Sequence, residues 1–275
     1  MIKVEHSVFA LPFALISALV ASRGLPSPHQ LLWILVAMVA ARSCAMAFNR
    51  IADRKFDSLN PRTQKWPLAA GLLSLPFVIL FTAVCAAIFI FAAFKLNTTA
   101  FILSPVALLI IFGYSLTKRF TSLSHWFIGL ALAIAPAGAW IAIRGNLEGT
   151  PLILSLAILF WTAGFDLIYS CQDAEFDRSH NLHSIPSKLG IKTALLIARI
   201  CHVITVALLI AFGFAANSGW LYYIGVSCVA MLLLYEHSLV NATDLSRVNE
   251  AFFTVNGAVG VLLLLFVSLD LFFRL

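Results

Sequence analysis

Nine long apolar segments follow one another along the chain and leave little room for any other kind of structure. An α-helix needs about 20 mainly apolar residues to cross the core of a bilayer, and only helices satisfy their backbone hydrogen bonds within one such segment. Strands of a membrane barrel would be about half as long and would alternate in polarity. The sequence therefore predicts an all-α integral membrane protein, a bundle of nine transmembrane helices. We place the spans near residues 7–23, 30–48, 71–94, 98–116, 124–143, 151–171, 191–215, 219–240 and 251–273.

The composition agrees with this prediction and narrows the class of partner. Hydrophobic residues make up 61% of the chain and charged residues only 11%, whereas a soluble domain carries about 25% charged residues. The net charge of +6 does not indicate nucleic-acid binding, because the basic residues lie in the loops between apolar segments, where membrane topology explains them. No linker or low-complexity segment interrupts the chain. We therefore expect a single domain over residues 1–275, a lipid bilayer as its surroundings and no nucleic-acid partner.

The ends of the predicted spans indicate an orientation. The amino-terminal apolar run has no clear cleavage site, so we interpret it as the first span and not as a signal peptide. If the amino terminus is cytoplasmic, 12 of the 18 Lys and Arg residues fall on the cytoplasmic side, 4 on the other side and 2 within spans. Cytoplasmic loops of membrane proteins carry an excess of Lys and Arg. We expect an N-in, C-out protein, placed in a bacterial inner membrane.

A first polar motif follows the second span. Asn49, Asp53 and Asp57 are spaced by four residues, so on a helix they form one slowly drifting stripe. Arg42, seven residues before Asn49, belongs to the same stripe and lies deeper in the membrane.

A second motif follows the sixth span, and its members are also spaced for one helical face. An even number of spans separates the two motifs, so they share one side of the membrane and can face one another across a cavity. An ionisable group near a span end is a functional candidate by default, although Arg42 and Asp166 could instead form a structural pair. Tyr169 could equally belong to an interfacial aromatic belt. The members of the second motif are Asp166, Tyr169, Asp173 and Asp177.

Two facing carboxylate stripes repel one another unless positive charge lies between them. Magnesium prefers carboxylate, phosphate and water oxygens, so we expect Mg²⁺ bridging a diphosphate to Asn49, Asp53, Asp57, Asp173 and Asp177. A charged site at the mouth of an apolar bundle suits a substrate with an anionic head and a hydrocarbon tail. The diphosphate also needs cationic partners, and the loop after the second motif adds a polar candidate. These substrate-binding candidates are Arg54, Lys118, Arg119, Lys188 and His183.

These motifs resemble those of the UbiA family of membrane prenyltransferases. Asn49, Asp53 and Asp57 match its N-x-x-x-D-x-x-x-D motif, and Asp173 and Asp177 match its second D-x-x-x-D motif. An upstream D-x-x-Y and a Y-x-x-x-K-R-x-T segment match as well, and the similarity covers essentially the whole chain. The resemblance implies nine helices around a central cavity, an active site on the cytoplasmic side and magnesium dependence. The upstream segments are Asp166 with Tyr169, and Tyr114 with Lys118, Arg119 and Thr121.

Within that family, the segments EHSVFALPFA, ARSCAMAFNR, NPRT and LHSIP are similar to the 4-hydroxybenzoate-type branch, which includes members assigned to menaquinone synthesis. The resemblance implies that Asp53, Asp57, Asp173 and Asp177 are catalytic and hold the metal. It implies transfer of a polyprenyl group from a polyprenyl diphosphate to an aromatic hydroxy-acid, 4-hydroxybenzoate or a dihydroxynaphthoate, in ubiquinone or menaquinone synthesis.

Other functions stay open at this point. The chain departs from many hydroxybenzoate enzymes at Leu182–Pro186 and at Trp66, so haem, chlorophyllide or glycerol phosphate remain alternative acceptors. A membrane transporter would also carry polar residues in its spans, but usually near mid-membrane and on broken helices.

Overall fold

Each of the nine apolar segments forms a helix in the computed structural model, which describes residues 9–273. Eight helices are long and apolar enough to cross a membrane, and α1 is a shorter apolar helix among the described residues. The beginning of the first predicted span, with Lys3, and Arg274 at the other end lie outside the described residues. The nine helices are α1 (Leu11–Ser22), α2 (Pro28–Leu59), α3 (Leu75–Leu96), α4 (Thr98–Gly113), α5 (Ser124–Arg144), α6 (Gly149–Ser170), α9 (Ile191–Ala215), α10 (Trp220–Ser238) and α11 (Asn256–Phe272).

Local sequence signals account for where several helices begin. Ser27 caps α2 in a capping box with Gln30, and proline follows it at the first helical position. This arrangement satisfies amide donors that a helix start otherwise leaves unpaired. Asn97 caps α4 through a bond of 2.9 Å from the amide of Ala100. These caps place the ends of the spans near the positions that the apolar pattern predicts.

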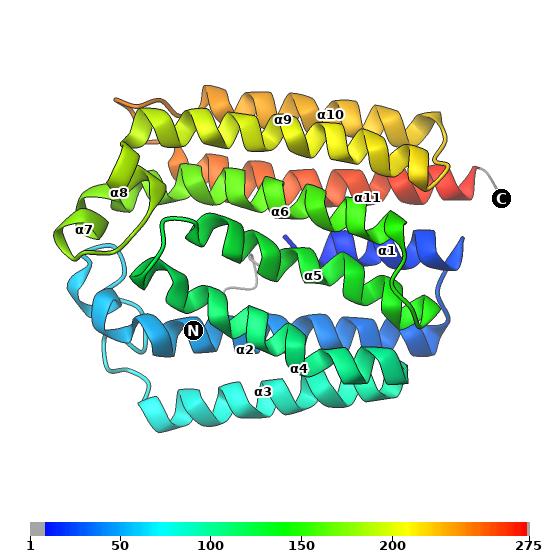
Figure 1. Ribbon diagram of the computed structural model, residues 1–275, viewed down its shortest axis with the longest axis horizontal. Helices are drawn as coiled ribbons and strands as arrows, with labels where there is room; N and C mark the ends of the chain where they lie inside the picture. The colour runs from blue at the N-terminus through cyan, green and yellow to red at the C-terminus, as the bar shows by residue number, and fades with distance from the viewer. Residues whose placement is uncertain (1–8, 274–275) are drawn as a thin grey trace.

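The long helices run side by side along the long axis of the molecule, and the predicted motifs lie at one end of it (Figure 1). The connections after α2, α4, α6 and α10 lie together at that end, at the left of the view. Short elements occupy this region: the 3₁₀ segments η2 (Tyr114–Arg119) and η3 (Cys171–Asp173), α7 (Ala174–Ser179), α8 (Ile185–Leu189) and the π-helical turn η4 (Glu250–Val255). The two motifs therefore share one end of the bundle.

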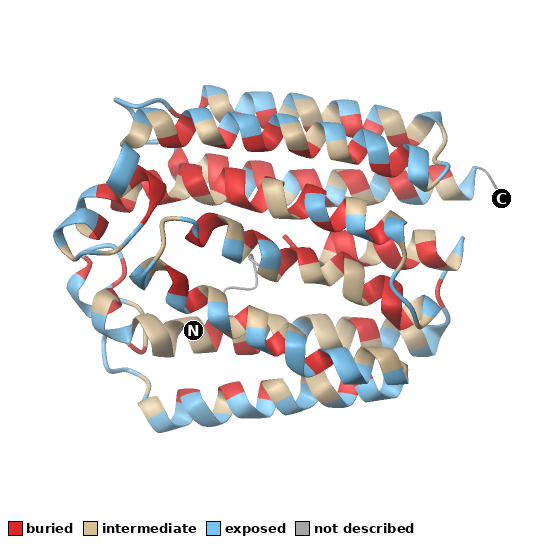
Figure 2. Ribbon diagram, viewed as in Figure 1, coloured by how far each residue is buried: buried red, intermediate tan, exposed pale blue. Residues whose placement is uncertain are grey.

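The outward faces of the helices are apolar, as a lipid-facing surface requires. Leu109, Val203 and Leu234 are each at least 70% exposed, and exposed positions line the outer faces of the bundle in Figure 2. Inside, α6 is packed against both α5 and α9. Gly129 lets α5 approach α6 closely, because a Cβ atom there would lie 2.5 Å from the carbonyl oxygen of Leu159. Tight packing through small residues is typical of helices in membranes.

Candidate active site at one end of the bundle

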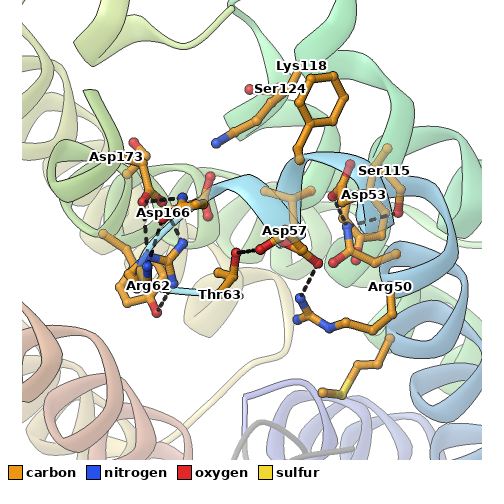
Figure 3. Close-up of a pocket in the computed structure, with 18 of the residues that line it drawn as sticks. Arg50, Asp53, Asp57, Arg62, Thr63, Ser115, Lys118, Ser124, Asp166 and Asp173 are labelled. Carbon is orange, nitrogen blue, oxygen red and sulfur yellow. Dashed lines mark hydrogen bonds and ion pairs between the residues drawn. The ribbon is translucent and has the colours of Figure 1, made fainter. Parts of the chain in front are cut away.

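A cavity of about 340 Å³ opens at the end of the bundle where the two motifs meet. Its walls come from α2, the segment after α2, η2, the end of α6, η3 and α7, and Figure 3 shows the charged groups converging on it. The members of both acidic motifs that line it are Asn49, Asp53, Asp57, Asp166, Tyr169, Asp173 and Asp177.

The helix α2 continues beyond its apolar part and carries the first motif into the cavity. The Asn49 side chain donates a hydrogen bond of 2.9 Å to Asp53, and its amide lies 3.4 Å from the Ser115 hydroxyl. Asp57, one turn further on, is buried and pairs with Arg50 at 3.4 Å. The guanidinium of Arg50 also lies 3.5 Å from the centre of the Trp66 ring, a cation–π arrangement that fixes its direction.

The second motif reaches the cavity although its helix is interrupted. The α-helix α6 ends at Ser170, and a 3₁₀ turn leads into α7. The helical spacing that the sequence predicts is therefore kept only approximately, but Asp166, Tyr169, Asp173 and Asp177 all still line the cavity.

Arg62 ties the two motifs together. Its Nε and Nη2 atoms donate to the two carboxylate oxygens of Asp173 at 2.9 and 2.6 Å, and Nη1 donates to the Tyr169 hydroxyl at 3.0 Å. Asn60 adds a bond of 3.3 Å to Asp173. Burial alone would lower the pKa of Arg62, but its hydrogen bonds and ion pair with Asp173 outweigh that effect and raise the pKa above its ordinary value. The guanidinium therefore stays charged at any working pH.

The two remaining carboxylates of the second motif, Asp177 and Asp166, also have charged or polar partners. Lys118 lies 3.3 Å from Asp177. Asp166 pairs with the buried His125 at 2.7 Å, and not with Arg42. The other ring nitrogen of His125 accepts a bond of 3.3 Å from the amide of Ile185, so Nδ1 is the nitrogen that donates to Asp166. This chain of contacts holds the start of α8 against α5 and α6.

The donor chemistry of the cavity fits magnesium bound together with a substrate anion. Asp53, Asp57, Asp173 and Asp177 supply oxygen ligands of the kind that Mg²⁺ prefers. Among residues 9–273, no group of three or more His, Cys, Asp or Glu side chains is arranged to hold a metal ion by itself. A site of this kind needs oxygen ligands from outside the protein, and phosphate oxygens and water are the usual ones for Mg²⁺.

The other predicted substrate-binding residues divide into two groups. Arg42 and Lys118 line the cavity, and Arg119 lies at its rim, 3.8 Å from Asp53. Arg54, His183 and Lys188 are exposed and lie outside the cavity lining. Arg54 directly follows Asp53, and one helical step turns a side chain by about 100°, away from the face that carries Asp53.

Several charged groups of the site did not stand out in the sequence. Arg50 and Arg62 contact the acidic motifs in addition to the predicted Lys118 and Arg119, whereas Arg54 forms no ion pair with them. Arg50 carried a usable signal, because it precedes Asp57 by seven residues and so lies on the same helical face. Arg62 belongs to the NPRT segment that carries part of the family resemblance, but no spacing linked it to Asp173. His125 carried no signal, since it meets Asp166 only through tertiary packing.

The fold and the cavity together define an integral membrane protein with a charged site for an anionic group at one end of an apolar bundle. The sequence model of the UbiA prenyltransferase family matches residues 10–272, and the chain belongs to this family. Similar proteins include the 4-hydroxybenzoate octaprenyltransferases of Nitrosospira multiformis and Marinobacter nauticus. Each is 30% identical over 92% of this chain, and the matches cover 87% and 86% of those proteins.

Solved structures show the same fold. A UbiA homolog from Aeropyrum pernix K1, in its apo form, superposes with a TM-score of 0.90 at 35% identity, covering 98% of this chain and 99% of that one. A UbiA homolog from Archaeoglobus fulgidus bound to GPP and Mg²⁺ has a TM-score of 0.75 at 21% identity, covering 97% of both chains. The predicted family and all-helical membrane fold are therefore confirmed.

Proposed function

We propose that this prenyltransferase transfers a polyprenyl group from a polyprenyl diphosphate to an aromatic hydroxy-acid. The observation that carries the proposal is the convergence of Asp53, Asp57, Asp173 and Asp177 on one cavity at the end of an apolar bundle. The names of the relatives, 4-hydroxybenzoate octaprenyltransferases, support the reaction class. They also support a role in ubiquinone synthesis.

Different cavity residues are proposed to bind the metal and the diphosphate. The four aspartates, with Asn49 assisting, are the proposed magnesium ligands. When bound, Mg²⁺ supplies positive charge that stabilises the departing diphosphate. Arg50, Arg62, Lys118 and Arg119 already pair with these carboxylates. They are therefore placed to contact the diphosphate oxygens once the substrate enters. Arg54, His183 and Lys188 are exposed and do not line the cavity. Their proposed role is to attract the anionic substrate.

The apolar part of the wall protects the reacting carbon. Ionisation of the allylic C–O bond leaves a carbocation that water would quench. Leu132, Phe165 and Phe252 line the cavity beside the charged groups and exclude water from it. The ring of the acceptor then attacks the cation, and the ring proton passes to a carboxylate or to the released diphosphate.

Arg42 is the proposed contact for the acceptor. It lines the cavity on the membrane side of the motifs, and its buried Nε atom has no hydrogen-bond partner among the described residues. A buried donor of this kind costs free energy unless a partner arrives, and the carboxylate of an aromatic acid would supply one. The acceptor hydroxyl makes the ring electron-rich, which attack on a carbocation requires. Tyr169, already bonded to Arg62, and Asp166 would border the same substrates.

The proposed acceptors are 4-hydroxybenzoate, for ubiquinone, and a dihydroxynaphthoate, for menaquinone. The names of the relatives favour these acids over haem, chlorophyllide and glycerol phosphate. Transport is disfavoured, because the charged residues line a cavity at one end of the bundle, where α2 and α6 end (Figure 1), and not near its middle. The basic residues at the same end support a cytoplasmic site in a bacterial inner membrane, formed by a single domain over residues 1–275.

The test is to identify the product. Purified protein in detergent, with Mg²⁺ and octaprenyl diphosphate, is offered 4-hydroxybenzoate, a dihydroxynaphthoate, and the same two rings without the carboxylate. Mass spectrometry should detect a prenylated product from an acid and little from its decarboxylated counterpart. Equal use of acceptors with and without the carboxylate would refute the role of Arg42, and the absence of any prenylated product would refute the reaction.

A further inference from the structure

A buried polar pair joins α10 to α11 at the active-site end of the bundle. Glu236, in the last turn of α10, and Asn256, the first residue of α11, are both 0% exposed. The side-chain amide of Asn256 donates a hydrogen bond of 2.8 Å to Oε1 of Glu236. The other carboxylate oxygen of Glu236 has no hydrogen-bond partner among the described residues and lies 3.7 Å from Nδ1 of His202. Neither Glu236 nor Asn256 lines the active-site cavity, so the pair takes no direct part in the proposed reaction.

The same amide also contacts the π-helical turn η4, which directly precedes Asn256. It is shared with the backbone carbonyls of Ala251, at 3.0 Å, and Phe252, at 3.3 Å. Single π-helical turns within α-helices are rare and are often found at functional sites. Asn256 therefore connects the carbonyls of η4 to the carboxyl group of α10.

A second contact joins α10 to the beginning of η4. Glu250, the first residue of the turn, accepts a hydrogen bond of 3.1 Å from the Tyr235 hydroxyl. Arg247 donates two more bonds to the same carboxylate, at 2.8 and 2.9 Å. Since Tyr235 and Glu236 are consecutive residues, one turn of α10 contacts both ends of η4. The contact at Glu250 is partly exposed, whereas the contact at Asn256 is fully buried.

The turn η4 supplies part of the wall of the active-site cavity, because Phe252 and Phe253 line that cavity. The Phe252 ring lies against Tyr169, with 4.1 Å between ring centroids and 33° between ring planes. It meets the Phe165 ring edge-on at 5.3 Å. Tyr169 in turn accepts the hydrogen bond from Arg62. A displacement of η4 would therefore open the aromatic wall directly beside the acidic motifs.

We propose that Glu236 and Asn256 are positioning residues that hold η4, and with it Phe252, in the wall that keeps water from the reacting carbon. The inference rests on the proposed function, because it assumes that an allylic cation forms at the carboxylates. When the allylic C–O bond breaks, its electron pair leaves with the diphosphate. The cation then bonds to a ring carbon of the acceptor, which releases the ring proton, or to water, which releases a proton and leaves a prenyl alcohol. The position of the wall therefore sets the ratio of the two products.

The pair acts through hydrogen bonds and not through charge. A glutamine at position 236 keeps an oxygen that accepts the bond from Asn256, so Glu236→Gln should preserve the position of η4. Glu236→Leu removes that acceptor. Asn256→Leu removes the donor from two carbonyls of η4 and leaves the Glu236 carboxyl group buried without a hydrogen bond, which destabilises this arrangement of the turn.

The experiment measures how the cation is divided between the acceptor and water. Purified variants in detergent receive Mg²⁺, octaprenyl diphosphate and 4-hydroxybenzoate in heavy-oxygen water, and mass spectrometry quantifies the prenylated acid and the octaprenol. Attack of water on the cation places heavy oxygen in the alcohol. Cleavage of a P–O bond by a contaminating phosphatase leaves the original oxygen there, so only labelled octaprenol is counted.

We expect Asn256→Leu to raise the ratio of labelled octaprenol to prenylated acid by about tenfold or more. Glu236→Leu, and Phe252→Leu, which alters the wall itself, should shift the ratio in the same direction. Glu236→Gln should keep the ratio of the unaltered protein. Thr205→Val is the matched control, because it removes a buried hydroxyl from α9, at a position that does not line the active-site cavity, and should not change the ratio.

A fall of both products by the same factor in Asn256→Leu would overturn the proposal, because it would show a general structural role. A shift in Glu236→Gln as large as that in Glu236→Leu would also overturn it, because the charge and not the hydrogen bond would then matter. If the buried variants do not fold, Glu250→Ala carries the test. It breaks the partly exposed contact of η4, should shift the ratio in the same direction, and would overturn the proposal by leaving it unchanged. If the unaltered protein formed no prenylated acid, the proposed function would fail instead.

Discussion

The bidentate contact between Arg62 and Asp173 should be a measurable source of stability in the substrate-free protein. The Arg62 side chain is 30% exposed and that of Asp173 9% exposed, so the pair lies between a surface ion pair and a fully buried one. A surface pair contributes about 0–1 kcal/mol, whereas breaking a buried pair costs about 3–5 kcal/mol. With two short bonds, at 2.9 and 2.6 Å, we expect a coupling energy of about 2 kcal/mol.

A double-mutant cycle measures this coupling. The variants are Arg62→Gln, Asp173→Asn and the combination of the two, and the free energy of unfolding is followed by circular dichroism during titration with a denaturing detergent. Chelator is present throughout, so that no metal competes for Asp173. Arg62→Lys is the matched control, because a lysine keeps the charge but loses the two-pronged geometry and should retain only part of the coupling.

The measured coupling energy shows whether the contact between Arg62 and Asp173 stabilises the protein. Additive effects, with a coupling below about 0.5 kcal/mol, are what independent sites show. Such a result would refute the argument that Arg62 joins the segment after α2 to the second motif.

Three further predictions concern the site and its orientation. Asp53→Ala should lower kcat by about 10²-fold or more, because it leaves diphosphate charge uncompensated. The control Glu175→Ala should leave turnover nearly unchanged, because that exposed side chain lies outside the cavity. If both motifs face the cytoplasm, as proposed, cysteines placed at Ser58 and Ser179 should both resist an impermeant thiol reagent added outside intact cells. Arg42→Gln should raise KM for the acceptor more than KM for the prenyl diphosphate, as measured by initial rates.

Each of these measurements has a contrary outcome. Near-normal turnover of the Asp53 variant in detergent, with helicity retained, would remove the first motif from the metal site. A cysteine at Asn146, in the connection between α5 and α6 at the other end of the bundle, is the labelling control and should react from outside. Labelling at one motif loop but not at the other would show that the two do not share a side. An unchanged acceptor KM would exclude Arg42 from acceptor binding.

The apolar pattern predicted the helices well because membrane spans are long and continuous. The ninth expected segment, residues 251–273, corresponds closely to η4 with α11 (Glu250–Phe272). The pattern did not show that this region begins with a π-helical turn, because such turns depend on local packing. It also placed the end of the second span near residue 48, whereas α2 continues to Leu59. The apolar run stops before the helix does, because the last turns of α2 carry charged residues at helical spacing.

The acidic half of the site was predictable, and the cationic half was only partly so. Carboxylates at helical spacing define a face by themselves, so Asp53 and Asp57 could be identified without a structure. Their partners are long side chains whose reach depends on the fold. Arg62 contacts Asp173 across 111 residues of sequence, and His125 contacts Asp166 across 41. No local pattern encodes contacts of this kind.

The dependence of turnover on magnesium tests the central claim most directly. Purified protein is treated with chelator and assayed with octaprenyl diphosphate and 4-hydroxybenzoate, and Mg²⁺ is then added back. If the paired carboxylates hold the diphosphate through Mg²⁺, turnover should be abolished by the chelator and restored by the metal. The substrate-free protein should remain folded throughout, because its carboxylates are already paired with Arg50, Arg62 and Lys118. Full turnover in metal-free buffer would contradict the account.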